Sequence, residues 1–234
     1  MAIRKARGKV EIFIQADLMD KISIVIRNRN ESDYIGFCLQ SIREYLPKSE
    51  VIIIDNESSD DSLEVVKLFS KDLDIQVLTL ARNIYSPGRS INLGASNASH
   101  PLVLVLSAHC RLLQKPDLHF VSQRLKTYVA VFGNQIPIYR GKKITKRYIW
   151  QHFGDTDVID MFSQIENRPF LHNAFCFYNR EFLLAHPFDE EYSGKEDRYW
   201  AFDMIQKGKS YYYASKLRVE HFWTVNGATW KGLG

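Results

Sequence analysis

The sequence predicts an α/β protein in which helices cover both faces of a central, mainly parallel sheet. Two observations support this fold class. Apolar strands alternate with amphipathic helices along the first half of the chain, and the strands are almost continuously apolar, as in sheets buried on both faces. The chain has 234 residues, of which 45% are apolar and 25% charged, so it is long enough to enclose such a sheet.

The first half of the chain is predicted to consist of strand–helix pairs. The helix after the first strand illustrates the pattern, because Ile35, Leu39 and Ile42 fall on one stripe. Ligands of open parallel sheets bind outside the carboxyl ends of the strands, so we expect a site just after the strand ends. The predicted strands are 22–27, 51–55, 74–80 and 101–107, and the predicted helices are 32–46, 60–71, 88–98 and 116–128.

The second half of the chain predicts a mixed arrangement of strands and one long helix. The segment 140–170 is irregular and rich in charged and aromatic residues. A helix over 196–208 ends at Gly208, a residue that suits the position after a helix end. Strands are predicted at 128–139, 171–183 and 210–223.

The domain organisation follows from the absence of a Gly/Ser linker, a repeat or a low-complexity tract. Residues 1–234 are therefore predicted to form one domain, with halves of about 22–110 and 111–234. Residues 9–17 alternate apolar and polar positions and resemble a short edge strand.

Charge and cysteine content limit the classes of partner and compartment. The net charge of +4 and the isoelectric point of about 8.8 suit an anionic small ligand or an acidic membrane surface, and they are too low to indicate nucleic acid. The three cysteines form no CxxC pair, so neither a zinc site nor a disulfide framework is indicated. A reducing, cytoplasmic location is expected, because the sequence also lacks a secretory signal and an apolar run of ~18 residues.

The turn after the first strand carries Arg27, Arg29 and Glu31 and contains no glycine. The glycine fingerprints of dinucleotide-binding folds and of P-loop kinases are both absent, which argues against a classical dehydrogenase or a Walker-A enzyme. Two arginines at this turn can contact phosphates or stack on a base. The alternative is that both arginines belong to the solvated surface.

Asp55 ends the second apolar strand, so its carboxylate is expected to point into a site and accept a hydrogen bond from a base or a ribose. The alternative is that this segment only shapes a turn before the next helix. Arg89 lies at the start of the helix after the third strand, and a helix N-terminus with an arginine is a reasonable anion site.

Four segments occur in an order and spacing that resemble the family-two nucleotide-sugar glycosyltransferases, whose fold is called GT-A. The resemblance covers about 22–223, and no single segment is specific without the others. It implies an inverting transfer of a sugar from a nucleoside-diphosphate sugar to a glycan or lipid-linked acceptor in surface polysaccharide synthesis. The segments are "ISIVIRNRNESDYIGFCLQSI", "VIIIDNESSDDS", "ARNIYSPGRSINLGASNASHPLVLVLSAH" and "FDEEYSGKEDRYWAFDMIQKG".

The resemblance also implies roles for the residues at the strand ends. The aspartate that matches Asp55 reads the nucleobase in this family. The residues that match Arg27, Arg29, Glu31 and Arg89 lie around the nucleotide.

The end of the fourth strand departs from the family pattern. Ser107-Ala108-His109 stands where the family has Asp-x-Asp, which binds the ribose and, through a divalent metal, the diphosphate. His221 matches a histidine that often supplies a second metal ligand, so His109 and His221 are expected to hold Mn²⁺ or, less readily, Mg²⁺. The alternative is that His109 only donates a hydrogen bond to the diphosphate, while arginines supply the positive charge.

The segment "GKEDRYW" carries the expected base. An inverting transfer needs one group to take the proton of the acceptor hydroxyl, and the resemblance assigns this role to Asp197, with Glu196 beside it. The alternative is an acid pair that only complements the helix dipole.

Two other functions compete with glycosyl transfer. A nucleotidyltransferase that makes sugar nucleotides typically carries a glycine-rich loop after the first strand, which is absent here. A non-catalytic nucleotide-sugar or glycan binder would not need the acid pair Glu196-Asp197. Two segments, 172–180 and 224–230, are expected to line the acceptor or sugar pocket. The basic run 139–150 is either a solvated loop or a contact with the anionic inner leaflet of the membrane.

Overall fold

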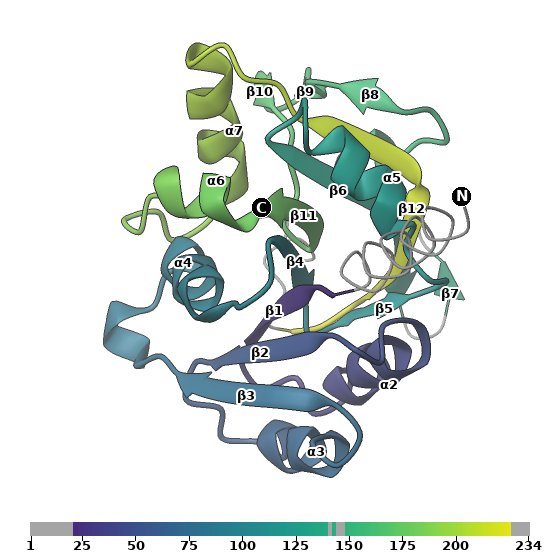
Figure 1. Ribbon diagram of the computed structural model, residues 1–234, viewed down its shortest axis with the longest axis vertical. Helices are drawn as coiled ribbons and strands as arrows, with labels where there is room; N and C mark the ends of the chain where they lie inside the picture. The colour runs from purple at the N-terminus through teal and green to yellow at the C-terminus, as the bar shows by residue number, and fades with distance from the viewer. Residues whose placement is uncertain (1–20, 140–141, 144–147, 226–234) are drawn as a thin grey trace, which may run out of the picture.

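The computed structural model describes residues 21–139, 142–143 and 148–225, and Figure 1 shows their arrangement. The expected edge strand at 9–17, the basic side chains between 140 and 147, and most of the segment 224–230 lie outside the described residues. No helix in the described part of the chain is long and apolar enough to cross a bilayer.

The first half forms the parallel part of a ten-stranded sheet, in the order β3-β2-β1-β4. β1 pairs in parallel with both β2 and β4, so the chain reverses its direction of winding at β1. All six residues of β4 are buried, as the continuous apolar run predicts, whereas β3 lies at the edge and is largely exposed. The bounds are β1 Ser23–Asn28, β2 Glu50–Asp55, β3 Asp74–Thr79 and β4 Leu102–Ser107.

The second half continues the same sheet in the order β11-β6-β12-β5. β11 is antiparallel to both β4 and β6, β12 is parallel to β6, and β5 closes the edge antiparallel to β12. β7 pairs with β6 and β8 with β12, while β9 and β10 form a separate ladder. The bounds are β5 Cys110–Leu112, β6 Ala130–Tyr139, β7 Lys142–Lys143, β8 Val158–Ile159, β9 Phe162–Ser163, β10 Arg168–Pro169, β11 Phe175–Asn179 and β12 Tyr212–Phe222.

Helices cover both faces of the sheet and divide the core into two layers (Figure 1). β1 shows the division, because Ile24 and Ile26 pack under α2 while Val25 packs under α4. A Cβ atom on Gly94 would lie 2.3 Å from Val25, so glycine lets α4 approach β1 closely. One layer holds α2 Ile35–Tyr45, α3 Ser62–Phe69 and α5 Leu118–Arg124, and the other holds α4 Pro87–Asn97, α6 Arg180–Ala185 and α7 Glu196–Gln206.

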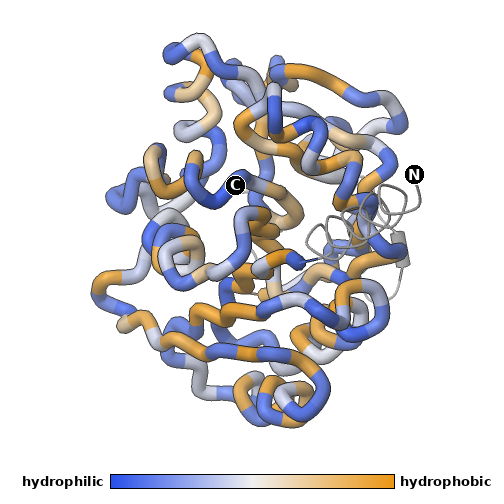
Figure 2. Tube along the Cα trace, viewed as in Figure 1, coloured by the Kyte–Doolittle hydropathy of each residue, from blue (hydrophilic) through white to orange (hydrophobic). Residues whose placement is uncertain are grey.

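The hydropathy of the chain follows this layered arrangement. Apolar residues concentrate along the central strands and on the sides of the helices that face them, whereas the loops are polar (Figure 2). The predicted α/β class with a mainly parallel first half and a mixed second half is confirmed.

Two predicted elements differ in detail, and one strand was not predicted. The segment 171–183 contains a strand only over Phe175–Asn179, because the Asn179 side chain accepts from Phe182 N and starts helix α6. The segment 210–223 is one strand with an irregular register between Ala214 and Arg218. The short strand β5 was not predicted, because three residues are too few to show a period.

Candidate active site

The site lies at the carboxyl ends of β1 and β4, where the winding of the sheet reverses. This is the position at which open α/β sheets bind ligands. Side chains from four segments distant in sequence converge here: the turn after β1, the turn after β4, the segment before β11 and the start of α7.

Asp55 is buried at the end of β2 inside a network of neutral donors. Its carboxylate accepts from Asn28 Nδ2 at 2.8 Å and from Ser58 Oγ at 2.6 Å and Ser58 N at 3.0 Å. Asn28 also donates to Ser62 Oγ at the first residue of α3. The network fixes the Asp55 carboxylate against the end of β1, which carries Arg27 and leads into the turn that carries Arg29.

Arg27 links the nucleotide-binding half to the start of α7. Its Nη1 lies 3.3 Å from Glu196 Oε1, and its side chain retains 21% of its exposure. Arg29, two residues further along, is exposed. Arg27 is therefore not simply a solvated surface residue, because it forms a partly buried ion pair.

Arg89 lies in the first turn of α4, as predicted, and it contacts an acidic partner that the sequence did not indicate. Its Nε donates to Glu190 Oε2 at 2.7 Å, and Glu190 Oε1 accepts from Asn92 Nδ2 at 3.0 Å. Ser86 caps the same helix by accepting from Arg89 N. The arrangement joins the N-terminal end of α4 to the loop that precedes α7.

His109 and Glu31 meet at the turn after β4. His109 Nδ1 lies 3.1 Å from Glu31 Oε1, and the Glu31 side chain is only 6% exposed. Ser107 is also buried, and its backbone N–H donates to Ala174 O. Glu31 is therefore placed to accept from the Nδ1–H of His109 and to fix the orientation of the ring.

His221 lies beside His109, although 112 positions separate them in the chain. The ring centroids are 4.9 Å apart, and His221 Nδ1 contacts Gln135 Oε1 at 2.8 Å. Burial lowers the pKa of His221 well below its usual range, and the nearby His109 and His172 lower it further, so the ring is neutral. Donation from Nδ1–H to the Gln135 oxygen makes Nε2 the lone-pair nitrogen of this neutral ring.

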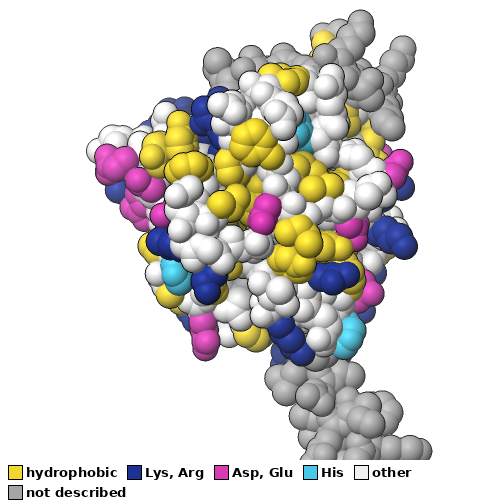
Figure 3. All heavy atoms as spheres, turned by 90° about the horizontal axis from the view of Figure 1, so that it is seen from above, with side chains coloured by type: hydrophobic (Ala, Val, Ile, Leu, Met, Phe, Trp, Pro, Cys, Tyr) yellow, Lys and Arg dark blue, Asp and Glu magenta, His cyan; other side chains and the backbone are white. Residues whose placement is uncertain are grey.

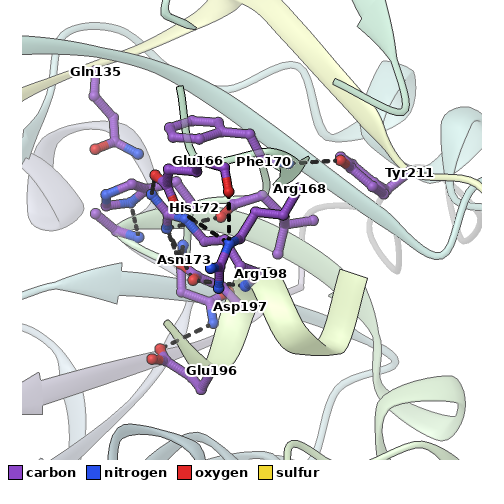
Figure 4. A network of polar contacts seen from close by, with 12 residues as sticks. Gln135, Glu166, Arg168, Phe170, His172, Asn173, Glu196, Asp197, Arg198 and Tyr211 are labelled. Carbon is purple, nitrogen blue, oxygen red and sulfur yellow. Dashed lines mark hydrogen bonds and ion pairs between the residues drawn. The ribbon is translucent and has the colours of Figure 1, made fainter. Parts of the chain in front are cut away.

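Asp197 is held by an arginine that follows it directly in the sequence. Arg198 Nη1 lies 2.9 Å from both carboxylate oxygens, and Asn173 N donates to Oδ2 at 3.0 Å (Figure 4). The Arg198 side chain is 3% exposed; it also donates to Leu171 O at 3.0 Å, and its guanidinium lies 4.4 Å from the centre of the Phe170 ring.

Glu196 differs from Asp197 in its environment. Burial raises the pKa of the Glu196 carboxyl, the neighbouring Asp197 raises it further, and Arg27 partly opposes the shift. Asn173 Nδ2 lies 3.4 Å from Glu196 Oε1, and the backbone N–H of Asn173 donates to Asp197 Oδ2. One asparagine therefore contacts both acids (Figure 4).

Four residues of this site were missed by sequence reasoning: Asn173, Gln135, Glu166 and Arg198. Asn173 lies in the segment 172–180, to which only a general pocket role was assigned. Arg198 stands inside the segment that predicted the acid pair, and its position next to Asp197 was the available signal. Glu166 lies 3.7 Å from Arg198 Nη2, but it falls in an irregular segment and shows no pattern in the sequence.

The predicted metal ligands are close together, but protein side chains alone do not complete a metal site. Within the residues that the structure describes, no group of three or more His, Cys, Asp or Glu side chains could hold a metal ion. Each of His109 and His221 nevertheless directs Nδ1 at a side-chain oxygen, as metal-binding histidines usually do with the ring nitrogen that is not bound to the metal. Among the described residues, this arrangement offers two nitrogen ligands at most.

Comparison with known proteins identifies the family. The model of the family described as "Glycosyl transferase family 2" matches residues 23–185. The chain belongs to glycosyl transferase family 2. The resemblance that the strand-end motifs implied is therefore confirmed, and membership favours a glycosyltransferase over a nucleotidyltransferase.

Curated relatives of this family-2 chain act on lipid-linked or polymeric acceptors, according to their names. A Campylobacter jejuni GalNAc(5)-diNAcBac-PP-undecaprenol beta-1,3-glucosyltransferase is 25% identical over 218 residues, which are 90% of this chain and 68% of the relative. The Staphylococcus aureus poly(ribitol-phosphate) beta-N-acetylglucosaminyltransferase TarS is 24% identical over 227 residues, 87% of this chain and 37% of the relative. The family-2 chain thus spans only part of each of these proteins.

Solved structures confirm the GT-A fold of this family-2 chain. The crystal structure of S. aureus TarS 1–349 in complex with UDP-GlcNAc gives a TM-score of 0.67 at 20% identity and covers 88% of this chain and 60% of TarS 1–349. The crystal structure of GalNAc-T7 with UDP, GalNAc and Mn²⁺ gives a TM-score of 0.64 at 18% identity. The match covers 88% of this chain and 44% of the GalNAc-T7 chain.

Proposed function

We propose that this protein is an inverting glycosyltransferase that moves a sugar from a nucleoside-diphosphate sugar to a hydroxyl of a lipid-linked or polymeric glycan acceptor in surface polysaccharide synthesis. One observation carries the proposal: Arg27, at the nucleotide-binding end of β1, lies 3.3 Å from Glu196, the neighbour of Asp197. The contact brings the donor side and the acid pair into one site. The named acceptors of the curated relatives support the acceptor class.

The proposed chemistry assigns the proton to Asp197. As the acceptor oxygen attacks the anomeric carbon, its O–H proton passes to a carboxylate oxygen of Asp197, and the bond from the anomeric carbon to the diphosphate oxygen breaks. The attack comes from the face opposite the leaving group, so the configuration inverts. Asn173 N and Arg198 hold the carboxylate in a fixed orientation, as a positioned base requires.

The leaving diphosphate gains negative charge, which positive groups and hydrogen-bond donors stabilise. We assign this role to three cations: Arg27 near the end of β1, Arg29 in the turn after it, and Arg89 in the first turn of α4. Asp55 is assigned to the nucleobase or ribose, and its bonds from Asn28 and Ser58 fix its position. Glu31 orients His109. Ser107, the buried last residue of β4, is assigned to the same part of the donor site.

A divalent metal, Mn²⁺ or Mg²⁺, fits this site as a bound cofactor. His109 and His221 would hold it through Nε2, because both rings turn Nδ1 toward a side-chain oxygen. The ion would neutralise diphosphate charge, and diphosphate oxygens would complete its coordination. The two imidazoles favour Mn²⁺ over Mg²⁺, which prefers oxygen ligands.

The location assigned is cytoplasmic and peripheral to the inner face of the membrane, where a lipid-linked acceptor lies. Support comes from the basic residues of 139–150, which suit an anionic lipid surface, and from the undecaprenol-linked acceptor in the name of the Campylobacter relative. Vesicle co-sedimentation with and without anionic lipid tests this assignment, and equal recovery with both vesicles would contradict it.

The decisive experiment is a donor hydrolysis and transfer assay across several nucleotide sugars, with added Mn²⁺ or after exhaustive EDTA treatment. Release of nucleoside diphosphate that depends on Mn²⁺ supports the transferase and the metal together. Full turnover after EDTA treatment would contradict the proposed role of the metal. In that case His109 would be assigned as a hydrogen-bond donor to the diphosphate. Binding of nucleotide sugars without any turnover would instead favour a non-catalytic binder.

A further inference from the structure

A cavity of about 670 Å³ lies along α7, outside the residues assigned to the donor. Its volume falls in the range of roughly 300–1,000 Å³ that is usual for small-molecule sites. Figure 3 views the molecule from the end at which α7 lies and shows apolar side chains spread over this face, with single charged groups between them. The lining includes Arg168, Asp189, Tyr192, Tyr199, Phe202 and Asp203.

Aromatic side chains form much of one wall of this cavity. The rings of Tyr192 and Tyr199 stack with centroids 4.1 Å apart and an interplanar angle of 9°, and the Arg168 guanidinium lies 5.3 Å from the centre of Tyr199. Phe202 is 51% exposed on the same helix. Such rings pack favourably against the C–H faces of pyranose sugars.

The charged groups of the cavity largely balance one another. Arg198, which lines it, is paired with Asp197 and Glu166, and Asp203 is paired with Lys207 at 2.7 Å. The cavity therefore favours neither a polyanion nor a cation. Its guanidinium donors and carboxylate acceptors instead match sugar hydroxyls, which donate and accept.

The cavity is connected to the proposed base by a single side chain. Arg198 lines the cavity and also contacts both oxygens of Asp197 at 2.9 Å. The cavity is therefore one side chain away from the carboxylate that is assigned to the acceptor hydroxyl, so the next unit of a saccharide acceptor would lie close to it. We propose that the cavity binds a neutral saccharide unit of the acceptor, next to the unit that receives the sugar; this inference rests on the proposed function.

The test measures binding without any donor, so that it is independent of turnover. Wild-type protein is applied to a printed array of neutral oligosaccharides of two to six pyranose units, and the best ligand is titrated by calorimetry. We expect Phe202→Ala to weaken its affinity about tenfold, which is the scale of one lost aromatic contact. Phe37→Ala is the matched control, because Phe37 is 50% exposed but lies on α2, outside the cavity lining. Both side chains are about half exposed, so neither substitution creates a cavity in the hydrophobic core.

Each outcome decides the proposal. Selective loss in Phe202→Ala supports it, whereas no oligosaccharide bound by the wild type, or equal affinity in wild type and Phe202→Ala, overturns it. An equal loss in Phe37→Ala also overturns it, because the effect would then not belong to the cavity. A second arm offers the bound oligosaccharide as an alkyl diphosphate conjugate, and the Phe202→Ala loss is expected to be unchanged. A loss confined to the conjugate would assign the cavity to the diphosphate-lipid portion and overturn the saccharide assignment.

Discussion

Asp55 and Asp197 are both buried aspartates at the candidate site, but their partners are of different kinds. Asp55 accepts from neutral donors, which are the side chain of Asn28 and the hydroxyl and backbone N–H of Ser58. Asp197 is held by a buried guanidinium that is itself shared with Glu166. The neutral network holds the Asp55 carboxylate as a hydrogen-bond acceptor for a ligand. The charged network instead balances the charges of Asp197 and Glu166 with that of Arg198. Losing a charged partner is therefore expected to cost far more than losing a neutral one.

The strongest test of this difference is Arg198→Met, which keeps much of the side-chain volume and removes the buried cation that contacts both Asp197 and Glu166. We expect the free energy of unfolding to fall by about 3–5 kcal/mol, the usual cost of breaking a buried ion pair from one side. Urea denaturation at neutral pH measures it. The matched control is Arg43→Met, since Arg43 and Asp72 form an exposed pair at 2.7 Å, which should cost less than ~1 kcal/mol. An equal loss of unfolding free energy in the two variants would contradict the proposed difference between the two networks.

Asp197→Asn keeps the size of the side chain but removes its capacity to take a proton. We expect glycosyl transfer to fall by roughly 10²-fold or more, the scale of general-base catalysis, while donor binding is retained. Initial rates and a donor titration on the same preparation separate the two effects. Near wild-type turnover would exclude Asp197 from the role of base and leave the charged network as a purely structural feature.

Asp55→Ala probes the neutral network. Donor affinity should weaken by ~1–3 kcal/mol, because a buried hydrogen-bond partner of the nucleobase or ribose is lost. Calorimetric titration with free nucleoside diphosphates gives the value directly. Asp74→Ala, on the exposed edge strand β3, is the control and should bind as the wild type does. An unchanged affinity in Asp55→Ala would show that this network only shapes the turn after β2.

The histidines between the two networks predict a pH dependence of stability. Burial lowers the pKa of His172 and His221, so the unfolded chain binds protons that the folded chain excludes. The stability that they contribute is present above ~6.5 and is lost as the pH falls, by up to ~1.4 kcal/mol per pH unit for each ring. Glu196, whose pKa is raised, acts with the opposite sign. His221→Gln should flatten the profile measured by urea denaturation between pH 5.5 and 7.5, and an unaltered slope would contradict this account.

Much of the fold was predictable because its first half consists of long, uniform signals. Each of β1, β2 and β4 is a continuous apolar run that two covering layers of helix require, so the end of each strand could be located within a few residues. α6 was missed because it has only six residues and follows β11 without a break. There the decisive signal was a single cap, Asn179, rather than a period.

The site was predictable to the extent that its residues lie at strand ends or in an ordered motif. Arg27 and Asp55 lie at the carboxyl ends of β1 and β2, and His109 follows β4, so their convergence is a property of parallel sheets. Gln135 and Glu166 could not be found in this way. Each acts through a contact across the fold, Gln135 with His221 and Glu166 with Arg198, and no local pattern records such a contact.

The position of β12 has a consequence for the order in which the protein matures during synthesis. This strand inserts between β6 and β5, with His221 opposite Cys110, and Phe222 N donates to His109 O at 2.9 Å. The ribosome makes His109 more than a hundred residues before His221. The parallel strands β1 to β4 can therefore form early on the nascent chain. The contact between His109 and His221 forms only when β12 has been made and has paired with β5 and β6. A chain that stalls before β12 carries Arg27 and the acid pair but lacks His221, so the contact between the two histidine rings cannot form in it.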